Sequence, residues 1–270
     1  MNRSGIITLL TDFGLTDAYT AMMKGVILSI NKNAKTIDIT HNINTGAIFQ
    51  AAGLLKETYR YFPEGTVHVA VVDPGVGSNR RLMAFKANNH FFVGPDNGIF
   101  CPVLDEAEDP QIVELTEEKY FLKNVTNTFH GREVFAPAAA HISLGVDLEK
   151  LGPPLEDPVV LSLPKPYVKD KILYGQVIRI DNFGNIITNI TEKHLKEFEP
   201  EENGAIQIGD VKIVGIKNVY NDVEEGELLA ILNSSNLLEI AVNLGRATEY
   251  IGIDVNDIVG SMVKVHKSRF

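Results

Sequence analysis

The apolar run Thr66-Val-His-Val-Ala-Val-Val72 leads directly into Asp73-Pro-Gly-Val-Gly-Ser-Asn-Arg-Arg81. The run predicts a buried strand, and a carboxylate and two arginines follow at its carboxyl end, where α/β sheets bind small molecules. Gly75 and Gly77 permit a tight turn and a close approach of the backbone to a ligand. The same residues fit a plain turn in which Asp73 caps a helix and the arginines are solvated, so this segment alone leaves both interpretations open.

In the first half of the chain, strand patterns alternate with helix patterns. Ile6–Leu10 and Thr36–Thr40 are typical of strands, and the segment from Thr45 to Tyr61 has the apolar spacing of a helix. We expect a further, alanine-rich helix over Val134–Leu144. Strands that alternate with helices predict an α/β layered sheet.

The second half has a different character. Short strands such as Gly175–Ile180 and Ile186–Ile190 predominate beyond Leu161–Pro166, a segment with two prolines that we expect to be a linker. Short strands with few helices predict a small antiparallel sheet or barrel. We therefore expect an N-terminal α/β layered-sheet domain over residues 1–163 and a smaller C-terminal antiparallel β-barrel-like domain over residues 164–270.

Composition and charge disfavour several classes of protein. Of the 270 residues 44% are hydrophobic, enough for one large core or two smaller ones, and the formal net charge is −10. An acidic chain is poorly suited to neutralise phosphates, so we expect no nucleic-acid partner. The start of the chain shows no signal-peptide pattern and no apolar run approaches about 18 residues, so we expect a cytoplasmic protein with no membrane partner.

Several common catalytic motifs are missing from the sequence. It contains no Gly-x-x-x-x-Gly-Lys-Ser/Thr phosphate loop, no Gly-x-Ser-x-Gly nucleophile elbow and no His-Glu-x-x-His zinc helix. The one cysteine, Cys101, has no partner for a disulfide and none at metal-ligand spacing. The usual nucleotide triphosphatases, serine hydrolases and zinc proteases are therefore disfavoured.

Two more polar residues of the first half lie where chemistry is expected. Asp12 directly follows the first predicted strand, a position from which a carboxylate commonly accepts hydrogen bonds from ribose hydroxyls. His130, within Thr128-Phe-His-Gly-Arg-Glu133, precedes the alanine-rich helix and is placed to relay a proton or to orient a water molecule. Each residue also fits a turn or a helix cap, and the residues alone leave that alternative open.

Three segments of the second half carry polar residues between or within apolar runs. Asp181-Asn-Phe-Gly-Asn185 has the composition of an ordinary hairpin turn. Asn233-Ser-Ser-Asn236 separates two strand-like runs, and Glu239 lies inside the second of them. An acid in that position is either exposed at an edge or held there for a purpose.

Together these segments resemble one family, the S-adenosyl-L-methionine (SAM) hydroxide adenosyltransferases, which are relatives of the fluorinases and chlorinases. The matching pieces keep the family's order over nearly the whole chain; they are Thr11-Asp-Phe-Gly14, Phe62-Pro-Glu-Gly-Thr-Val67, Asp73-Pro-Gly-Val-Gly77, Gly94-Pro-Asp-Asn-Gly98, Thr128-Phe-His-Gly-Arg132, Asp181-Asn-Phe-Gly-Asn185 with Thr188-Asn-Ile190, and Asn233-Ser234 with Glu239-Ile-Ala-Val-Asn243.

The resemblance implies a homotrimer whose sites lie between the N-terminal domain of one subunit and the C-terminal domain of its neighbour. It implies that Asp73, Arg80 and His130 are the catalytic residues, with Arg81 beside Arg80 as an alternative arginine. It also implies that Asp12 binds the ribose and that Asp73 contacts the substrate. The remaining substrate contacts that it implies, to adenine and to methionine, are Asp181, Asn185, Ser234, Glu239 and Val242, the valine through its backbone.

The resemblance is to the hydrolytic rather than the halogenating branch. Relatives that bind halide have tyrosines at the positions of Asp73 and His130, and the fluorinase threonine that contacts halide falls at Val76. A carboxylate aimed at a halide site would repel the anion, and the valine side chain offers it no donor. The resemblance therefore implies water as the nucleophile.

The implied reaction converts SAM and water into adenosine, L-methionine and a proton, with no metal and no cofactor. Two other functions remain open from the sequence. A metal-dependent hydrolase of another nucleoside compound would use Asp12, Asp17, Asp73 and His130. A non-catalytic adenosine or SAM sensor would keep Asp12 and Asn185 as binding residues.

Overall fold

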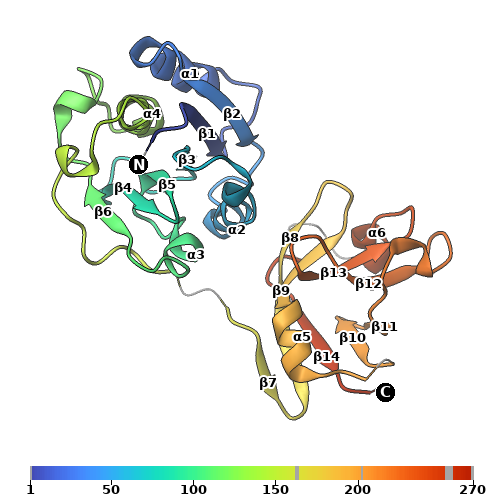
Figure 1. The fold of residues 1–270 in the computed structure, drawn as a ribbon. Coiled ribbons are helices and arrows are strands. Elements are labelled where there is room, and N and C mark those ends of the chain that lie inside the picture. The colour runs from blue at the N-terminus through green and yellow to red at the C-terminus, as the bar shows by residue number, and fades with distance from the viewer. Residues whose placement is uncertain (1, 162–163, 202, 253–257, 269–270) are drawn as a thin grey trace. The chain divides into compact units, whose positions relative to one another are not determined.

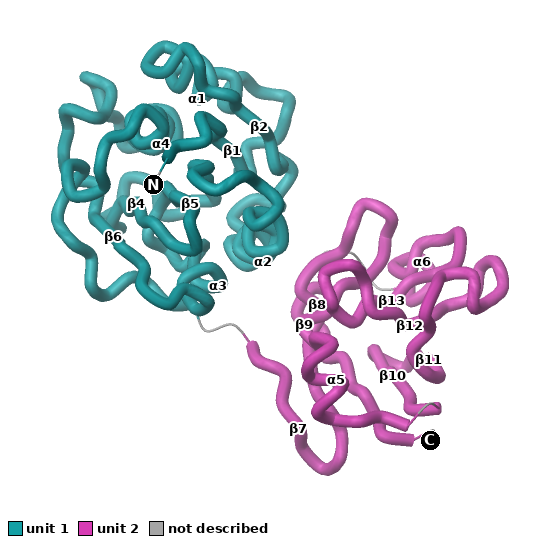
Figure 2. The backbone as a smooth tube through the Cα atoms, in the orientation of Figure 1, with its two compact units in different colours: residues 1–162 teal, residues 163–270 magenta. Residues whose placement is uncertain are grey.

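The computed structural model describes residues 2–161, 164–201, 203–252 and 258–268, and these form two compact units (Figure 2). The first unit is Met1–Ser162 and the second is Leu163–Phe270. The expected boundary between residues 163 and 164 stays a prediction, because it falls next to Ser162 and Leu163, which lie outside the described residues. Over the described ranges, no helix is long and apolar enough to cross a membrane.

The first unit is built on a mixed six-stranded sheet with the order β2-β1-β3-β5-β4-β6. The pairs β2–β1, β1–β3 and β3–β5 are parallel, whereas β4 runs antiparallel to β5 and β6. The strands are β1 (Ile6–Thr11), β2 (Lys35–Thr40), β3 (Val67–Val71), β4 (Leu82–Ala87), β5 (His90–Pro95) and β6 (Gln111–Glu114).

Helices cover both faces of this sheet, with α1 (Tyr19–Ile30) and α4 (Ala136–Ser143) on one face and α2 (Ile48–Thr58) and α3 (Cys101–Leu104) on the other (Figure 1). Alternate residues of a strand point to opposite faces. In β3, Val69 accordingly packs in the core beneath α1 and α4, and Ala70 packs in the core beneath α2 and α3. The predicted α/β layered sheet is confirmed. Short helical turns complete the unit: η1 (Tyr59–Tyr61), η2 (Glu118–Tyr120), η3 (Gly131–Phe135) and η4 (Leu148–Lys150).

The helix expected from Thr45 to Tyr61 is shorter in the structure. It comprises α2 and the turn η1, and it begins at Ile48. Gly46 has a positive φ of 72°, and its N–H donates a hydrogen bond to the Asp12 carboxylate at 2.9 Å. The residues before Ile48 are therefore held in a loop against the end of β1, and the apolar pattern of the sequence does not reveal that contact.

The parallel register brings three of the sequence motifs to one edge of the sheet. Thr11 of β1 pairs with Val71 of β3, and Val69 pairs with Val93 of β5. Asp12, Asp73 and the Gly94–Gly98 segment therefore emerge together at the carboxyl ends of neighbouring strands, where ligands bind in such sheets.

The second unit is an eight-stranded antiparallel sheet, in the order β11-β10-β14-β8-β9-β13-β12 with β7 added to β8. Lys217, after β11, bridges to Ile231 of β12, so the two ends of this order meet and the sheet forms a nearly closed barrel, which confirms the predicted barrel-like domain. Its strands are β7 (Tyr167–Lys169), β8 (Ile172–Ile180), β9 (Ile186–Thr191), β10 (Ala205–Ile208), β11 (Val211–Val214), β12 (Leu228–Leu232), β13 (Leu237–Val242) and β14 (Met262–His266); the helices are α5 (Glu192–Phe198) and α6 (Ala247–Ile251), with the turn η5 (Tyr220–Asp222).

Two buried histidines lie in the core beneath α2 and α3. The Thr8 hydroxyl is 2.8 Å from His68 Nδ1, and His68 Nε2 is 3.1 Å from His90 Nδ1, so the three strands β1, β3 and β5 are joined by side-chain hydrogen bonds. Burial, and secondarily the proximity of His90, lowers the pKa of His68 to about 3. His68 is therefore a neutral hydrogen-bonding residue of the folded core at physiological pH.

This cluster predicts acid-sensitive stability. The unfolded chain takes up a proton at His68 near the ordinary pKa of about 6.5, whereas the folded chain does not, so the contribution of His68 is complete above that pH and decreases as the pH falls toward 3. The maximal effect is roughly 5 kcal/mol. In denaturant unfolding at a series of pH values, His68→Asn should reduce the slope of stability against pH between 6.5 and 4; identical slopes for the two proteins would refute the prediction.

Candidate active site

The loop after β3 positions Asp73 and Arg80. Val76 N–H donates to the Asp73 carbonyl at 3.2 Å, and Ser78 Oγ donates to the Gly75 carbonyl at 2.7 Å, so the loop folds back on itself. Gly77 has a φ of 80°, and a Cβ at this position would lie 2.4 Å from the Asn127 carbonyl oxygen. Only glycine allows this approach. Gly77 thus packs the Asp73 loop against the segment that leads to His130.

Arg80 joins Asp73 to His130. Its Nε lies 2.7 Å from each carboxylate oxygen of Asp73, and its Nη2 completes the ion pair. The same Nη2 donates to His130 Nδ1 at 2.9 Å. The side chains of Asp73 and Arg80 are only 5% and 8% exposed, so these charge-assisted bonds are shielded from water. The structure therefore brings together the three residues that the sequence nominated for catalysis.

The surroundings of His130 favour its neutral imidazole form. It immediately precedes the π-helical turn η3, which continues into α4, a feature frequent at functional sites. Because arginine only donates hydrogen bonds, His130 Nδ1 accepts from Arg80, and the ring proton of the neutral form is assigned to Nε2. Burial, followed by the positive charge of Arg80, lowers the pKa of His130, although Asp73 and Glu133 oppose the shift.

One donor of Arg80 remains without a protein partner. Nη1 is buried and makes no hydrogen bond to any residue that the structure describes. A buried donor of this kind ordinarily has an acceptor, and a charged one attracts an oxygen that carries negative charge. The Asp73–Arg80–His130 group therefore presents one donor to a small oxygen ligand while its other donors hold the group together.

Arg81, the alternative arginine, points into a different set of contacts. Its Nε donates to Asp96 at 2.8 Å, and its Nη1 pairs with Asp157 at 2.6 Å. Asp96 also accepts the Val159 N–H at 2.8 Å. Arg81 thus ties the loop after β3 to the segment near the end of the first unit, and it makes no hydrogen bond to Asp73 or His130 among the described contacts.

Two further contacts near these residues are not evident from the sequence. Phe13, Tyr19 and Phe129 form a cluster of edge-to-face rings with centroids 5.2–5.9 Å apart, next in sequence to Asp12 and His130. The phenylalanines belong to the quoted motifs, but the pairing of Tyr19 with them has no local sequence signal. Gly46, which binds Asp12, was likewise missed because it lies 34 positions away.

In the second unit, the turn between β8 and β9 holds Asp181 and Asn185. Asp181 Oδ1 accepts the N–H groups of Phe183 and Asn185, each at 2.9 Å, and Oδ2 accepts Asn185 Nδ2 at 3.2 Å. Both oxygens of Asp181 are thus used within the turn. Asp181 orients Asn185, which is itself buried.

Ser234, Glu239 and Val242 are spread along the hairpin of β12 and β13. Ser234 is exposed in the turn that precedes β13, whereas Val242 ends this strand. Ile240 pairs with Ile186, so the Asn185 turn lies at the Val242 end and Ser234 lies at the opposite end. Glu239, between them, is 3% exposed and accepts a hydrogen bond from Tyr220 Oη at 2.8 Å. Burial raises its pKa.

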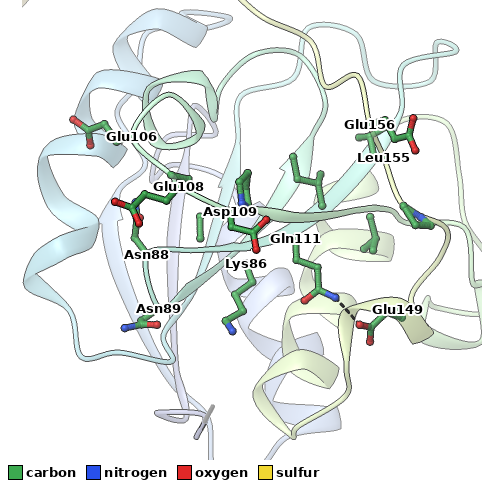
Figure 3. Close-up of a pocket in the computed structure, with 16 residues that line it drawn as sticks. Lys86, Asn88, Asn89, Glu106, Glu108, Asp109, Gln111, Glu149, Leu155 and Glu156 are labelled. Carbon is green, nitrogen blue, oxygen red and sulfur yellow. Dashed lines mark hydrogen bonds between the residues drawn. The ribbon is translucent and has the colours of Figure 1, made fainter.

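A separate pocket of about 1020 Å³ lies at the other edge of the first sheet, beside the turn between β4 and β5 (Figure 3). Carboxylates dominate its polar rim, among them Glu108, Asp109 and Glu156, and Gln111 donates to Glu149 at 2.5 Å. None of the predicted site residues lines this pocket. Within the described ranges, no group of three or more His, Cys, Asp or Glu side chains is arranged to hold a metal ion.

Comparison with known proteins agrees with both units. The family model for the SAM hydroxide adenosyltransferase N-terminal domain matches residues 7–152, and the model for the C-terminal domain of the same family matches residues 175–260. A protein of Salinispora tropica named (R)-S-adenosyl-L-methionine hydrolase is 34% identical over 93% of this chain and 95% of its own length. A protein of the same name from Methanocaldococcus jannaschii is 37% identical, with 93% and 94% covered.

More distant and structural relatives fit the same pattern. A fluorinase of Actinoplanes is 27% identical over 73% of this chain and 75% of its own length. The crystal structure of an uncharacterized conserved protein from Thermotoga maritima superposes with a TM-score of 0.89 at 35% identity, covering 96% of this chain and 99% of that one. With the family models matching both units and full-length relatives above 30% identity, this chain belongs to the SAM hydroxide adenosyltransferase family.

Proposed function

We propose that the protein hydrolyses SAM to adenosine and L-methionine by in-line attack of water at the ribose C5′. The observation that carries this proposal is the hydrogen-bonded Asp73–Arg80–His130 group with the unpaired, buried donor at Arg80 Nη1. In a member of the SAM hydroxide adenosyltransferase family, that donor suits the oxygen of an attacking water or hydroxide.

The chemistry of the leaving group decides where the protein must assist. Methionine departs from a sulfonium as a neutral thioether, so it needs no general acid. Water is a poor nucleophile at neutral pH, and it must lose a proton as it attacks. Arg80 Nη1 stabilises the developing hydroxide electrostatically, and Asp73 or His130 receives the proton. The lowered pKa of His130 favours its neutral ring at neutral pH, and Nδ1 takes up a proton when it exchanges the hydrogen bond from Arg80 for one from the attacking water.

The remaining predicted residues place C5′ in line with the nucleophile. Asp12, held by Gly46 at the same sheet edge as Asp73, binds the ribose hydroxyls. Asn185 and the Val242 backbone bind the adenine at one end of the β13 hairpin, and Ser234 and Glu239 bind the methionine moiety toward the other. Positioning of this kind supplies much of the acceleration of a bimolecular attack. In this scheme Asp181 acts by orienting Asn185.

We further propose that the protein is a homotrimer in which Asp12, Asp73, Arg80 and His130 of one subunit face the substrate-binding residues of the second unit of its neighbour. The carboxylate of Asp73 also accounts for water rather than halide as the nucleophile. An anion placed beside it would be repelled, whereas a water molecule gains an acceptor.

The reaction is tested with purified, metal-stripped protein and SAM in halide-free buffer, with products resolved by chromatography. Adenosine and methionine in equal amounts are expected.

Asp73→Asn and His130→Ala should each lower kcat about 100-fold or more and change KM little, because both act on the attacking water. Intact SAM would favour a sensor, and turnover restored only by a divalent cation would favour a metal-dependent hydrolase.

The position of Arg80 predicts a shift in the titration of His130. Arg80→Gln should raise the pKa of His130, because the arginine's charge and its hydrogen bond to Nδ1 both favour the neutral ring. Arg81→Gln is the matched control and should leave that pKa unchanged, since Arg81 pairs with Asp96 and Asp157. Imidazole NMR signals followed against pH measure both; equal shifts in the two variants would rule out the assigned contact.

A shared site predicts complementation between inactive chains. Asp73→Ala lacks a residue of the first unit and Asn185→Ala one of the second, so each homotrimer should be inactive. Trimers assembled from both chains, co-expressed with different tags, should regain part of the activity, because some sites combine an intact first unit with an intact second unit. Mixed trimers without activity would show that each chain builds its site alone.

A further inference from the structure

Glu239 is an unusual residue for the centre of a barrel strand. Its neighbours in β13 are apolar, and Glu239 itself is only 3% exposed. It pairs across the sheet with Ile231 of β12 and Ile187 of β9. A charged group in such a place lowers stability unless hydrogen bonds and an opposite charge compensate for its lost hydration.

The groups that hold Glu239 are neutral. Tyr220 Oη donates to its Oε1 at 2.8 Å, and the Asn233 side chain provides a second hydrogen bond. Two charges act on it from nearby, and they oppose each other: Asp181 raises the pKa of Glu239 and Arg179 lowers it, with Asp181 the stronger influence. The carboxylate is therefore oriented by its donors but not neutralised by them, which suits a site that receives a cation.

Hydrogen bonds hold the segment that carries Tyr220 in place, so its hydroxyl can orient this carboxylate. It lies in η5, where Asp222 Oδ2 accepts the N–H groups of Asn218 and Val219 at 2.9 and 3.1 Å. Lys217 N–H donates to the Ala230 carbonyl at 2.7 Å and ties the start of this segment to β12. The ring of Tyr220 is partly exposed while its hydroxyl reaches inward to Glu239. Burial, together with the bond to Glu239, raises the pKa of Tyr220 to about 12, so the hydroxyl stays a donor.

We propose that Tyr220 is a positioning residue for the substrate, which holds Glu239 so that its carboxylate accepts the α-ammonium group of the methionine moiety. The proposal rests on the proposed SAM hydrolysis. It adds a residue that has no counterpart among the sequence motifs and acts only through Glu239. Adenosine carries no ammonium group, so the Tyr220–Glu239 pair distinguishes one half of the substrate from the other.

Tyr220→Phe removes only the hydroxyl and should raise KM for SAM about tenfold or more, as expected for a lost hydrogen bond to a charged group, while kcat is retained. Because the Tyr220 hydrogen bond favours the ionised carboxylate, its loss raises the pKa of Glu239, and the acid limb of kcat/KM should move to higher pH. Tyr250→Phe, at an exposed tyrosine of α6, is the matched control and should change neither.

Product binding separates positioning from a general loss of structure. Calorimetric titration of Tyr220→Phe should show weaker binding of L-methionine and unchanged binding of adenosine. Glu239→Gln should have the same selectivity, and adding Tyr220→Phe to it should have no further effect, since the hydroxyl acts through the carboxylate.

Two outcomes would overturn the role of Tyr220 in a wild-type protein that hydrolyses SAM: KM and pH profile unchanged in Tyr220→Phe, or affinity for adenosine lost together with that for methionine. A wild-type protein that binds both products but leaves SAM intact would instead overturn the proposed hydrolysis. In that case selective loss of methionine binding would still support the Tyr220–Glu239 pair as an ammonium site.

Discussion

The parallel pairing of β1, β3 and β5 is the constraint on which the rest of the first unit depends. It aligns Thr11 with Val71 and Val69 with Val93, so that loops far apart in the chain emerge at one edge of the sheet. Apolar packing on both faces holds the three strands, and the hydrogen bonds through His68 join them from within. Because the lowered pKa of His68 favours its neutral form, these hydrogen bonds join the strands without adding a charge to the core.

On that edge, a single guanidinium organises the catalytic candidates. Arg80 uses Nε and Nη2 to bind Asp73 and His130 and retains Nη1 for another acceptor. The two adjacent arginines make different contacts because their side chains point in different directions. Arg80 turns inward toward His130, whereas Arg81 binds Asp96 and Asp157 and stabilises the loop from its other side. The fork of donors in arginine allows both functions, and a lysine would offer neither geometry.

In the proposed scheme, the second unit binds a polar, cationic molecule by means of a small barrel. Turns and strand ends supply Asn185 and Ser234, and one acid, Glu239, is buried within a strand and held by Tyr220. Neutral donors keep the acid in place without satisfying its charge. In the proposed scheme, the first unit activates the attacking water, and the second unit binds the two ends of SAM.

Local patterns in the sequence determined the fold class of both units. Alternation of strands and helices specifies a layered sheet, and short strands with few helices specify a barrel, because these periodicities reflect which side chains each element buries. The motifs also nominated Asp73, Arg80 and His130, and family resemblance supplied their roles. Only the tertiary structure decided where α2 begins, which of the two arginines contacts Asp73 and His130, and that Tyr220 binds Glu239. Each depends on groups brought together from distant parts of the chain, and hydrogen bonding, burial and charge between such groups leave no periodic trace in the sequence.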